Sequence, residues 1–330
     1  MSLSSAWEIW NASPRELEIH LNSKVNTSRQ RKICFYAPSF TYYKTSSFAS
    51  LHNEFPTVSV TGNICSLNCR HCGGKVLETM HATTTPDKLV AFCAKLKRDN
   101  ALGVLVSGGC LPDGVVPLHR FIPALAEVKQ RFGLTVFVHT GIVDEETASC
   151  LKSAGVDAAL LDVIGCDETI RQVYNLDVST KCFENSLKAL HKGKMPFVPH
   201  VVVGLHNGEL KGEFAALRMI EPYQPSAIVI IGFMPIRGTA MAVTTPPSPH
   251  DIARTIAAAR AIFPQTPIVL GCMRPKGRHR SETDVLALKA GVDGIAFPSQ
   301  EAIRFVRKAG FLVTFLPVCC AQIYVDLVET

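Results

Sequence analysis

Three closely spaced cysteines are the strongest chemical signal in this chain. Cys65, Cys69 and Cys72 follow a C-x3-C-x2-C pattern, directly after a short β-branched run typical of a buried strand. Structural zinc sites use four ligands, usually as paired C-x2-C units, and the chain has no second such pair and no H-x3-H. Iron–sulfur clusters usually take four cysteines, so three leave one iron without a protein ligand. The spacing predicts a [4Fe-4S] cluster with an open iron, and a structural metal knuckle or free thiols are the alternative.

The remaining cysteines are not expected to form disulfides. The chain has 12 cysteines among 330 residues and lacks a secretory signal pattern at its start, which indicates a reducing compartment and metal or redox chemistry. Cys93, Cys150 and Cys182 fall on apolar helix faces and are interpreted as core. Five further cysteines are candidates for a second, auxiliary iron–sulfur cluster: Cys34, Cys110, Cys272, Cys319 and Cys320. A subset of them holds this cluster, or all are scattered buried thiols, and both alternatives stay open.

Eight short runs rich in Val, Ile, Leu and Phe are expected to be the strands that position these cysteines. Most of the runs are nearly continuous in apolar residues, which is typical of parallel strands buried on both faces. Cys65, Cys110 and Cys272 each come just after or at the end of a run. The runs are Thr57–Gly62, Gly103–Gly108, Leu134–Thr140, Ala158–Gly165, Phe197–Leu205, Ala227–Pro235, Ile268–Met273 and Gly294–Pro298.

Amphipathic stretches such as Pro86–Asp99, Leu118–Phe132 and Asp251–Phe263 separate the runs. This alternation predicts an α/β fold, a (β/α)8 TIM-type barrel of ~250 residues with its chemistry at the carboxyl ends of the strands. An open, partial barrel of about six units with an appended layer is the alternative. We expect residues 1–56 to form an N-terminal extension with a helix around Ala6–Asn22. Residues 57–330 are expected to form the barrel, with a C-terminal segment, 311–330, capping one end.

The composition excludes several classes of protein. Apolar residues make up 47% and charged residues 19%, which is unlike a disordered chain, and the net charge of +6 is unlike a nucleic-acid-binding one. The longest apolar runs have about ten residues, whereas a membrane helix needs ~20. We therefore expect a soluble, cytoplasmic protein without a nucleic-acid or membrane partner.

Cys65, Cys69 and Cys72, placed after the first strand of such a barrel, resemble the signature of the radical S-adenosylmethionine superfamily. The resemblance implies an open iron that binds S-adenosylmethionine, whose cleavage gives a 5′-deoxyadenosyl radical that abstracts hydrogen from an unactivated carbon. His71 stands where the family often has an aromatic residue, a departure that leaves the ligands unchanged.

Other segments resemble the parts of that family that contact S-adenosylmethionine. Ser107-Gly108-Gly109 is similar to its glycine-rich segment, and Val201–Leu205 with Gly208-Glu209 to its adenine-contacting element, although the first glycine is absent. Asp162 and Arg171 are the expected partners of the ribose and the methionyl carboxylate, with helix caps or surface pairs as the alternative. The implied S-adenosylmethionine contacts are Gly108, Gly109, Asp162, Arg171 and Gly204.

Over most of its length the chain resembles the biotin-synthase-like branch, and within it the second protein of the archaeal-type two-protein lipoyl synthases. The segments Ser107–Cys110, His139–Gly141 and Gly271–Pro275 carry this finer resemblance. It implies sulfur insertion into an octanoyl chain on a lipoyl-type carrier domain, together with a sister radical protein and a ferredoxin or flavodoxin-type electron donor.

Three rim residues, His139, Arg274 and Arg278, are candidates for substrate or carrier contact. A solvated basic loop is the alternative for the two arginines, and a core histidine for His139. Two other functions are kept beside sulfur insertion. One is a one-cluster radical enzyme in cofactor maturation or rearrangement, and the other is a non-catalytic iron–sulfur or metal-binding protein.

Overall fold

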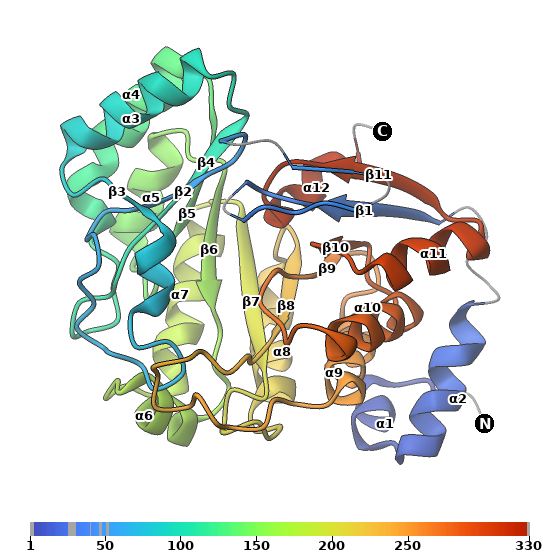
Figure 1. Ribbon diagram of the computed structural model, residues 1–330. Coiled ribbons are helices and arrows are strands. Elements are labelled where there is room, and N and C mark those ends of the chain that lie inside the picture. Colours follow the sequence, from blue (N-terminus) through green and yellow to red (C-terminus); the bar gives the residue numbers. More distant parts are fainter. Residues whose placement is uncertain (1–2, 26–30, 40, 46–47, 51–52, 329–330) are drawn as a thin grey trace.

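The computed structural model of the protein describes residues 3–25, 31–39, 41–45, 48–50 and 53–328. Its centre is one 11-stranded sheet with the strand order β11-β1-β10-β9-β8-β7-β6-β5-β4-β2-β3. Every pair of neighbouring strands in this sheet is parallel. Parallel strands require crossover connections, and helices supply them on the outer face of the curved sheet (Figure 1). The predicted α/β, TIM-type fold class is confirmed.

All eight predicted strands are present, and each lies inside the run that predicted it. Their side chains alternate between a core shared with the outer helices and a second core on the concave side of the sheet. Burial on both faces explains why the runs are almost continuously apolar. The strands are β2 (Thr57–Ser59), β4 (Gly103–Ser107), β5 (Thr135–His139), β6 (Ala158–Asp162), β7 (Phe197–Val203), β8 (Ile228–Gly232), β9 (Ile268–Leu270) and β10 (Gly294–Ala296).

Three further strands extend the sheet at its two ends. β1 (Lys32–Tyr36) lies between β10 and β11 (Leu312–Leu316), while β3 (His81–Ala82) pairs with β2 at the opposite edge. Among the described residues no pairing joins β3 to β11, so the sheet is an open half-barrel and not a closed ring. β1 belongs to this sheet although it precedes residue 57, where we expected the barrel to begin.

Several helices begin where the sequence supplies capping groups. Ser248 and Asp251 form a capping box at the start of α9, and Thr85 accepts from the backbone of Lys88 at the start of α3. The single helix predicted around Ala6–Asn22 is two helices, because Pro14 begins a new one. The helices are α1 (Ala6–Asn11), α2 (Pro14–Val25), α3 (Pro86–Arg98), α4 (Ile122–Phe132), α5 (Glu145–Ser153), α6 (Asp167–Tyr174), α7 (Thr180–Lys192), α8 (Glu213–Ile220), α9 (Pro249–Ile262), α10 (Arg278–Ala290), α11 (Gln300–Ala309) and α12 (Ile323–Asp326).

The C-terminal segment fills the concave side of the sheet. After β11, Cys320 and Ile323 are buried against inward residues of the strands. The Tyr36 hydroxyl donates to Asp326 Oδ2 at 2.8 Å, and the Tyr324 hydroxyl donates to the carbonyl of Asp157 at 3.0 Å. The segment thus reaches the start of β6 and packs inside the half-barrel. None of the helices in the described part of the chain is long and apolar enough to cross a membrane.

Candidate active site at the carboxyl ends of the strands

The predicted cysteine triplet lies in the loop that follows β2. Tight turns bring its members together: the backbone N–H of Gly73 donates to the carbonyl of Cys69 at 2.7 Å, and that of Cys72 to the same oxygen at 3.1 Å. The thiols of Cys69 and Cys72 are hydrogen-bonded, and this bond lowers the pKa of Cys72 to about 7. The same bond is the main cause that raises the pKa of Cys69, followed by burial and by the charges of Cys72 and Cys65. The three thiols therefore lie in one neighbourhood after β2.

Gly109, just after β4, forms the floor on which the cysteine loop rests. A Cβ atom at this position would lie 2.1 Å from the carbonyl oxygen of Ile64 and 2.6 Å from Cα of Cys65, so only glycine fits. The N–H of Gly109 donates to Thr61 Oγ1 at 2.7 Å. The glycine-rich segment therefore seats the cysteine loop, and contact of Gly108 and Gly109 with S-adenosylmethionine stays a prediction.

The donor set of the loop fits an iron–sulfur cluster. Cluster irons take cysteine thiolates as ligands, and a pKa of about 7 at Cys72 makes the thiolate accessible near neutral pH. Because Gly109 has no side chain, the segment after β4 does not push Cys65 out of its position. The residues that would hold the cluster are Cys65, Cys69 and Cys72.

The five cysteines proposed for an auxiliary cluster do not form a single group. Cys110 is a neighbour of the triplet, since Cys65 and Cys72 both raise its pKa, although burial is the main cause of its rise to about 12. Cys34 is fully buried on β1, where burial raises the pKa of its thiol. Cys110 thus lies with the triplet, whereas Cys34 shares a buried cluster with Cys320.

The other three cysteines do come together. The thiols of Cys319 and Cys320 are hydrogen-bonded, which lowers the pKa of Cys319 and raises that of Cys320. Cys272, which follows β9, interacts with both of them, and burial raises its pKa to about 11. Residues from the end of a strand and from the C-terminal segment thus form a second thiol group, which we call the Cys272 group (Cys272, Cys319 and Cys320).

Arg274 does not contact a substrate or a carrier. Its side chain is fully buried, and Nε donates to Asp284 Oδ1 at 2.7 Å. The two terminal nitrogens donate to the carbonyls of Gly271 and Phe297 at 2.6 and 3.2 Å. All three nitrogens are used inside the protein, which corrects the prediction at Arg274. Arg278 is exposed at the start of α10, so its contact with a carrier stays a prediction.

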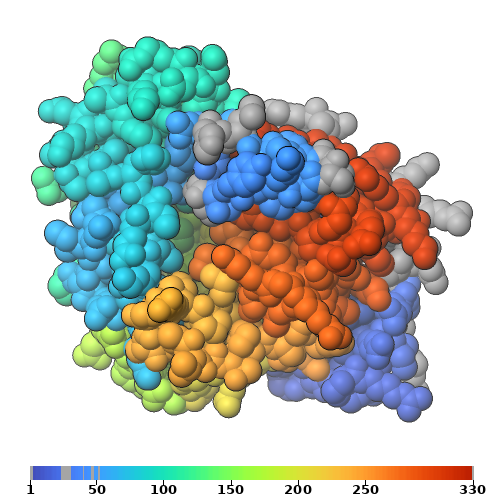
Figure 2. Space-filling view, in the orientation of Figure 1, coloured from blue at the N-terminus to red at the C-terminus, as the bar shows by residue number. Residues whose placement is uncertain are grey.

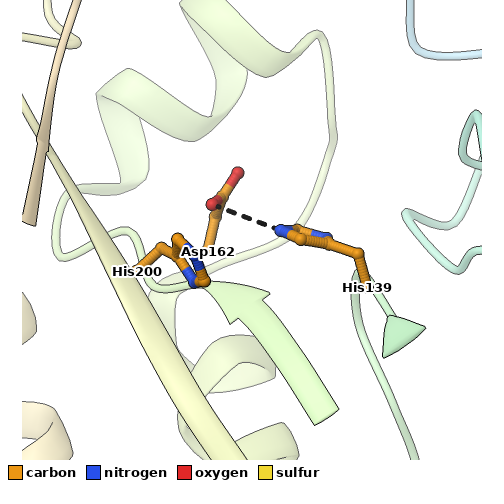
Figure 3. Close-up of side chains that lie close together, drawn as sticks. All are labelled: His139, Asp162 and His200. Carbon is orange, nitrogen blue, oxygen red and sulfur yellow. Dashed lines mark ion pairs between the residues drawn. The ribbon is translucent and has the colours of Figure 1, made fainter. Parts of the chain in front are cut away.

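A polar group connects the cysteine loop to the ends of three strands. The Tyr174 hydroxyl donates to Asp162 Oδ2 at 2.9 Å, while the Tyr174 carbonyl accepts from Cys69 Sγ at 3.5 Å. The ring of His71 packs on that of Tyr174, with centroids 5.1 Å apart. His139 Nε2 lies 3.8 Å from Asp162 Oδ1 (Figure 3). Asp162 is therefore at the centre of the site, and its contact with ribose stays a prediction.

His200 belongs to the same group, and the sequence reasoning missed it. Its ring is 5.6 Å from that of His139, and its Nδ1 lies 3.1 Å from the carbonyl of Val198. Burial lowers the pKa of His200 to about 4, so the ring is neutral at neutral pH. A polar residue at an inward position of an otherwise apolar strand is the signal that marks it.

The backbone N–H and carbonyl of Gly204 form hydrogen bonds within the chain. Its N–H donates to Glu213 Oε1 at 2.8 Å, its carbonyl accepts from Gly208, and a Cβ there would lie 2.6 Å from Pro247. These contacts use the N–H of Gly204 and one lone pair of its carbonyl, and contact of Gly204 with S-adenosylmethionine stays a prediction. Arg171 is exposed on α6, one turn before Tyr174, and its predicted contact is untested.

The loop from residue 233 to 248 lies over the cysteine loop. A Cβ atom added to Gly73 would lie 3.8 Å from Thr239, and one added to Gly238 would lie 3.5 Å from Lys75. The two loops are therefore in contact. In Figure 2 the gold surface of the first loop meets the cyan and blue surface of the second. This contact shields one side of the cysteine triplet from solvent.

Comparison with known proteins agrees with this site. Residues 59–215, which contain the cysteine triplet, Asp162 and His200, match the Radical SAM superfamily. The chain is 27% identical to biotin synthase of Geobacter metallireducens over 215 residues, 62% of this chain and 64% of that protein. It is 26% identical to biotin synthase of Prochlorococcus marinus strain NATL2A over 286 residues, 78% of each chain. The match to biotin synthase 2 of Polaromonas sp. strain JS666 covers 52% of that protein, so the chain spans about half the length of some of these relatives.

Solved structures share the fold. HydG, a maturase of the [FeFe]-hydrogenase, aligns with a TM-score of 0.66 at 16% identity, over 98% of this chain and 73% of that chain. Methylornithine synthase (PylB) aligns with a TM-score of 0.61 at 15% identity, over 98% and 99% of the two chains. At these identities the likeness shows the fold alone. The superfamily match covers slightly less than half of the chain, includes the cysteine loop, and is accompanied by biotin synthases as relatives at low identity.

Proposed function

We propose that this chain is a radical S-adenosylmethionine enzyme that abstracts hydrogen from an unactivated carbon and inserts sulfur there, as the resemblance to lipoyl synthases implies. The observation that carries the proposal is the Cys272 group, a second set of three thiols gathered at a strand end and in the C-terminal segment. Three cysteines suit a second cluster that holds sulfur, and nothing in hydrogen abstraction alone requires them. Biotin synthases are among the relatives, which also supports the proposal of sulfur insertion.

The chain's own residues divide the work. Cys65, Cys69 and Cys72 would hold the radical cluster, which with S-adenosylmethionine supplies a 5′-deoxyadenosyl radical when both are bound. Gly109 fixes the position of Cys65 against β4, and the loop from 233 to 248 covers one side of the triplet. A radical site needs such cover, because water and oxygen lead to side reactions.

Iron and sulfide counting tests the proposal for a second cluster. We expect about eight irons per chain in anaerobically reconstituted protein, from two four-iron clusters. A triple alanine variant of the Cys65 triplet and one of the Cys272 group should each keep about four. Retention of about eight irons in the second variant would show that the Cys272 group holds no cluster.

Sulfur insertion itself requires a product assay. Protein reconstituted with isotopically labelled sulfide is supplied with S-adenosylmethionine, a reductant and an octanoyl-lysine peptide, and the peptide is analysed by mass spectrometry. We expect labelled sulfur in the product of the wild type and none in the Cys272-group variant, while 5′-deoxyadenosine forms in both. Equal labelled product in both would refute the donor role of the Cys272 group.

A one-cluster radical enzyme of cofactor maturation or rearrangement is the second candidate. It is favoured by the raised pKa values of Cys272 and Cys320, because protonated buried thiols behave as core residues. This candidate predicts about four irons in the wild type and none in the variant without the Cys65 triplet.

The partners belong to the same proposal. A lipoyl-type carrier domain would dock beside the start of α10, where Lys276 and Arg278 are exposed and cationic. A sister radical protein and a ferredoxin or flavodoxin-type donor complete the proposed system. Arg278→Glu with Lys276→Glu should lower kcat/KM for the octanoylated carrier and leave that for the octanoyl-lysine peptide unchanged. Equal loss with both substrates would contradict docking at this position.

A further inference from the structure

Three side chains with metal-ligating atoms converge beside the cysteine loop, and none of them is a cysteine. His139 and Asp162 are the last residues of β5 and β6, and His200 lies on the neighbouring strand β7. One ligand atom from each lies within 4.8 Å of the other two. Figure 3 shows the carboxylate of Asp162 and the two rings turned toward the same space. Three adjacent strands thus hold a set of two imidazoles and one carboxylate on rigid backbone.

Hydrogen bonds outside the set orient two of its three members, His200 and Asp162. The carbonyl of Val198 can only accept, so the Nδ1 of His200, 3.1 Å away, carries the proton and Nε2 carries the lone pair. Metal-bound histidines commonly donate their other N–H to a carbonyl in this way. The Tyr174 hydroxyl donates to Asp162 Oδ2, which leaves Oδ1 facing the histidines. At 3.8 Å, His139 Nε2 is too far from Oδ1 for a good hydrogen bond.

The charge balance of the set calls for a cation. Within the described part of the chain, no lysine or arginine is bonded to any of these three side chains, and Asp162 is half-buried. A carboxylate and imidazole lone pairs that face the same space would attract a cation placed between them.

We propose that His139, Asp162 and His200 bind one divalent transition-metal ion in a three-ligand site with an open coordination position. Two imidazoles and a carboxylate are the ligands that suit Zn²⁺ and Fe²⁺, whereas the cysteine groups offer only sulfur. Metal–ligand distances of ~2.0–2.2 Å require the three atoms to approach one another by about 1 Å, which side-chain rotation supplies. The open position would hold an oxygen, nitrogen or sulfur atom of a substrate next to the radical site. The inference does not depend on sulfur insertion.

Zinc is the probe, because it is redox-inactive and its ligands are distinguishable. Anaerobically reconstituted holoprotein is treated with a small excess of Zn²⁺, passed over a chelating resin, and analysed for zinc, iron and sulfide. We expect about one zinc per chain, and an X-ray absorption shell of nitrogen and oxygen at ~2.0–2.1 Å without sulfur at ~2.3 Å. Wild-type protein without zinc, or zinc bound through sulfur, would overturn the proposal.

Variants locate the ion. His139→Gln with His200→Gln should lose the zinc while iron and sulfide stay unchanged, and His119→Gln, at an exposed position, should keep all three. Tyr174→Phe removes only the hydroxyl bonded to Asp162 and should weaken zinc binding by ~10–100-fold. Zinc retained in the double histidine variant would refute the site. If that variant also loses iron, the absorption shell of the wild type decides the matter alone.

Discussion

Replacing Gly109 by alanine is expected to displace the cysteine loop and release the radical cluster. The added Cβ would lie 2.1 Å from the backbone oxygen of Ile64 and 2.6 Å from both Cα and Cβ of Cys65. These atoms belong to backbone and to a short side chain, so rotation cannot relieve the contact. The loop that carries Cys65 must therefore move as a unit, by roughly 1 Å, to reach ordinary contact distances of ~3.5 Å.

The magnitude follows from two contributions. Overpacking of a well-packed site costs about 1–3 kcal/mol. Movement of the loop also strains the bond from Gly109 N–H to Thr61 Oγ1, now 2.7 Å long, and a lost hydrogen bond costs about 1 kcal/mol. The free energy of unfolding should thus fall by roughly 2–4 kcal/mol. A misplaced Cys65 leaves only two ligands in position.

The assay compares iron and sulfide content, and the urea midpoint, across matched glycine variants. Gly109→Ala should retain as little radical-cluster iron as Cys65→Ala in a background without the Cys272 group. Gly108→Ala is the internal control, because its Cβ meets only side-chain atoms of Val60 and Thr61, at 3.0 and 3.3 Å. Gly193→Ala, at the end of α7, controls for a glycine outside the site.

The reasoning fails if Gly109→Ala binds a full cluster with wild-type stability. It also fails if Gly108→Ala loses as much iron as Gly109→Ala, since the contacts at Gly108 are nearly 1 Å longer. Either result would mean that the loop adapts to β4 without a fixed position for Cys65.

Three other substitutions test the account. Burial raises the pKa of Glu213 from 4.5 to about 7, so the carboxyl group stays protonated to higher pH in the folded state than in the unfolded state. The free energy of unfolding of the wild type therefore falls as pH rises from about 4.5 to 7. The stability of Glu213→Gln relative to wild type should therefore increase over this window, by at most about 3 kcal/mol, in urea titrations at several pH values; a flat difference contradicts the buried acid. Asp284→Ala leaves the fully buried guanidinium of Arg274 without its carboxylate and should cost about 3–5 kcal/mol in the same titrations, whereas a loss below about 1 kcal/mol would contradict their pairing. Cys110→Ala should retain the wild-type iron content, because Cys65, Cys69 and Cys72 already supply the three expected ligands; loss of a whole cluster would make Cys110 a ligand.

The strands of the fold could be predicted where they are buried on both faces. Apolar residues are then nearly continuous, and length with flanking turns distinguishes such a run from a helix. β1 was missed, and the closed barrel was preferred to the open, partial barrel that was kept as the alternative. β1 pairs with β10 and β11, about 260 residues or more further along the chain, and such distant pairing leaves no local pattern. The contacts of the C-terminal segment, which packs on the concave side and reaches the start of β6, are equally distant in sequence.

The same difference between local and distant contacts explains which residues of the site could be predicted. The cysteine triplet is a local motif, and its spacing was sufficient to find it. His200 and Tyr174 belong to the site because they contact residues at the ends of other strands, His139 and Asp162. Their own residue types therefore give little indication of a role in the site. Arg274 was misassigned because a basic run does not show which guanidinium turns inward, and its partner Asp284 lies on the following helix.

Formation of 5′-deoxyadenosine is the most direct test of the central claim, that Cys65, Cys69 and Cys72 hold a cluster with an open iron. Reconstituted wild-type protein, given S-adenosylmethionine and a strong reductant, should release 5′-deoxyadenosine and methionine in equal amounts. Serine substitution of any one of the three cysteines should abolish both products, and Cys110→Ala should not. Absence of 5′-deoxyadenosine from wild-type protein with a full iron content, or its formation by the serine variants, would contradict the account.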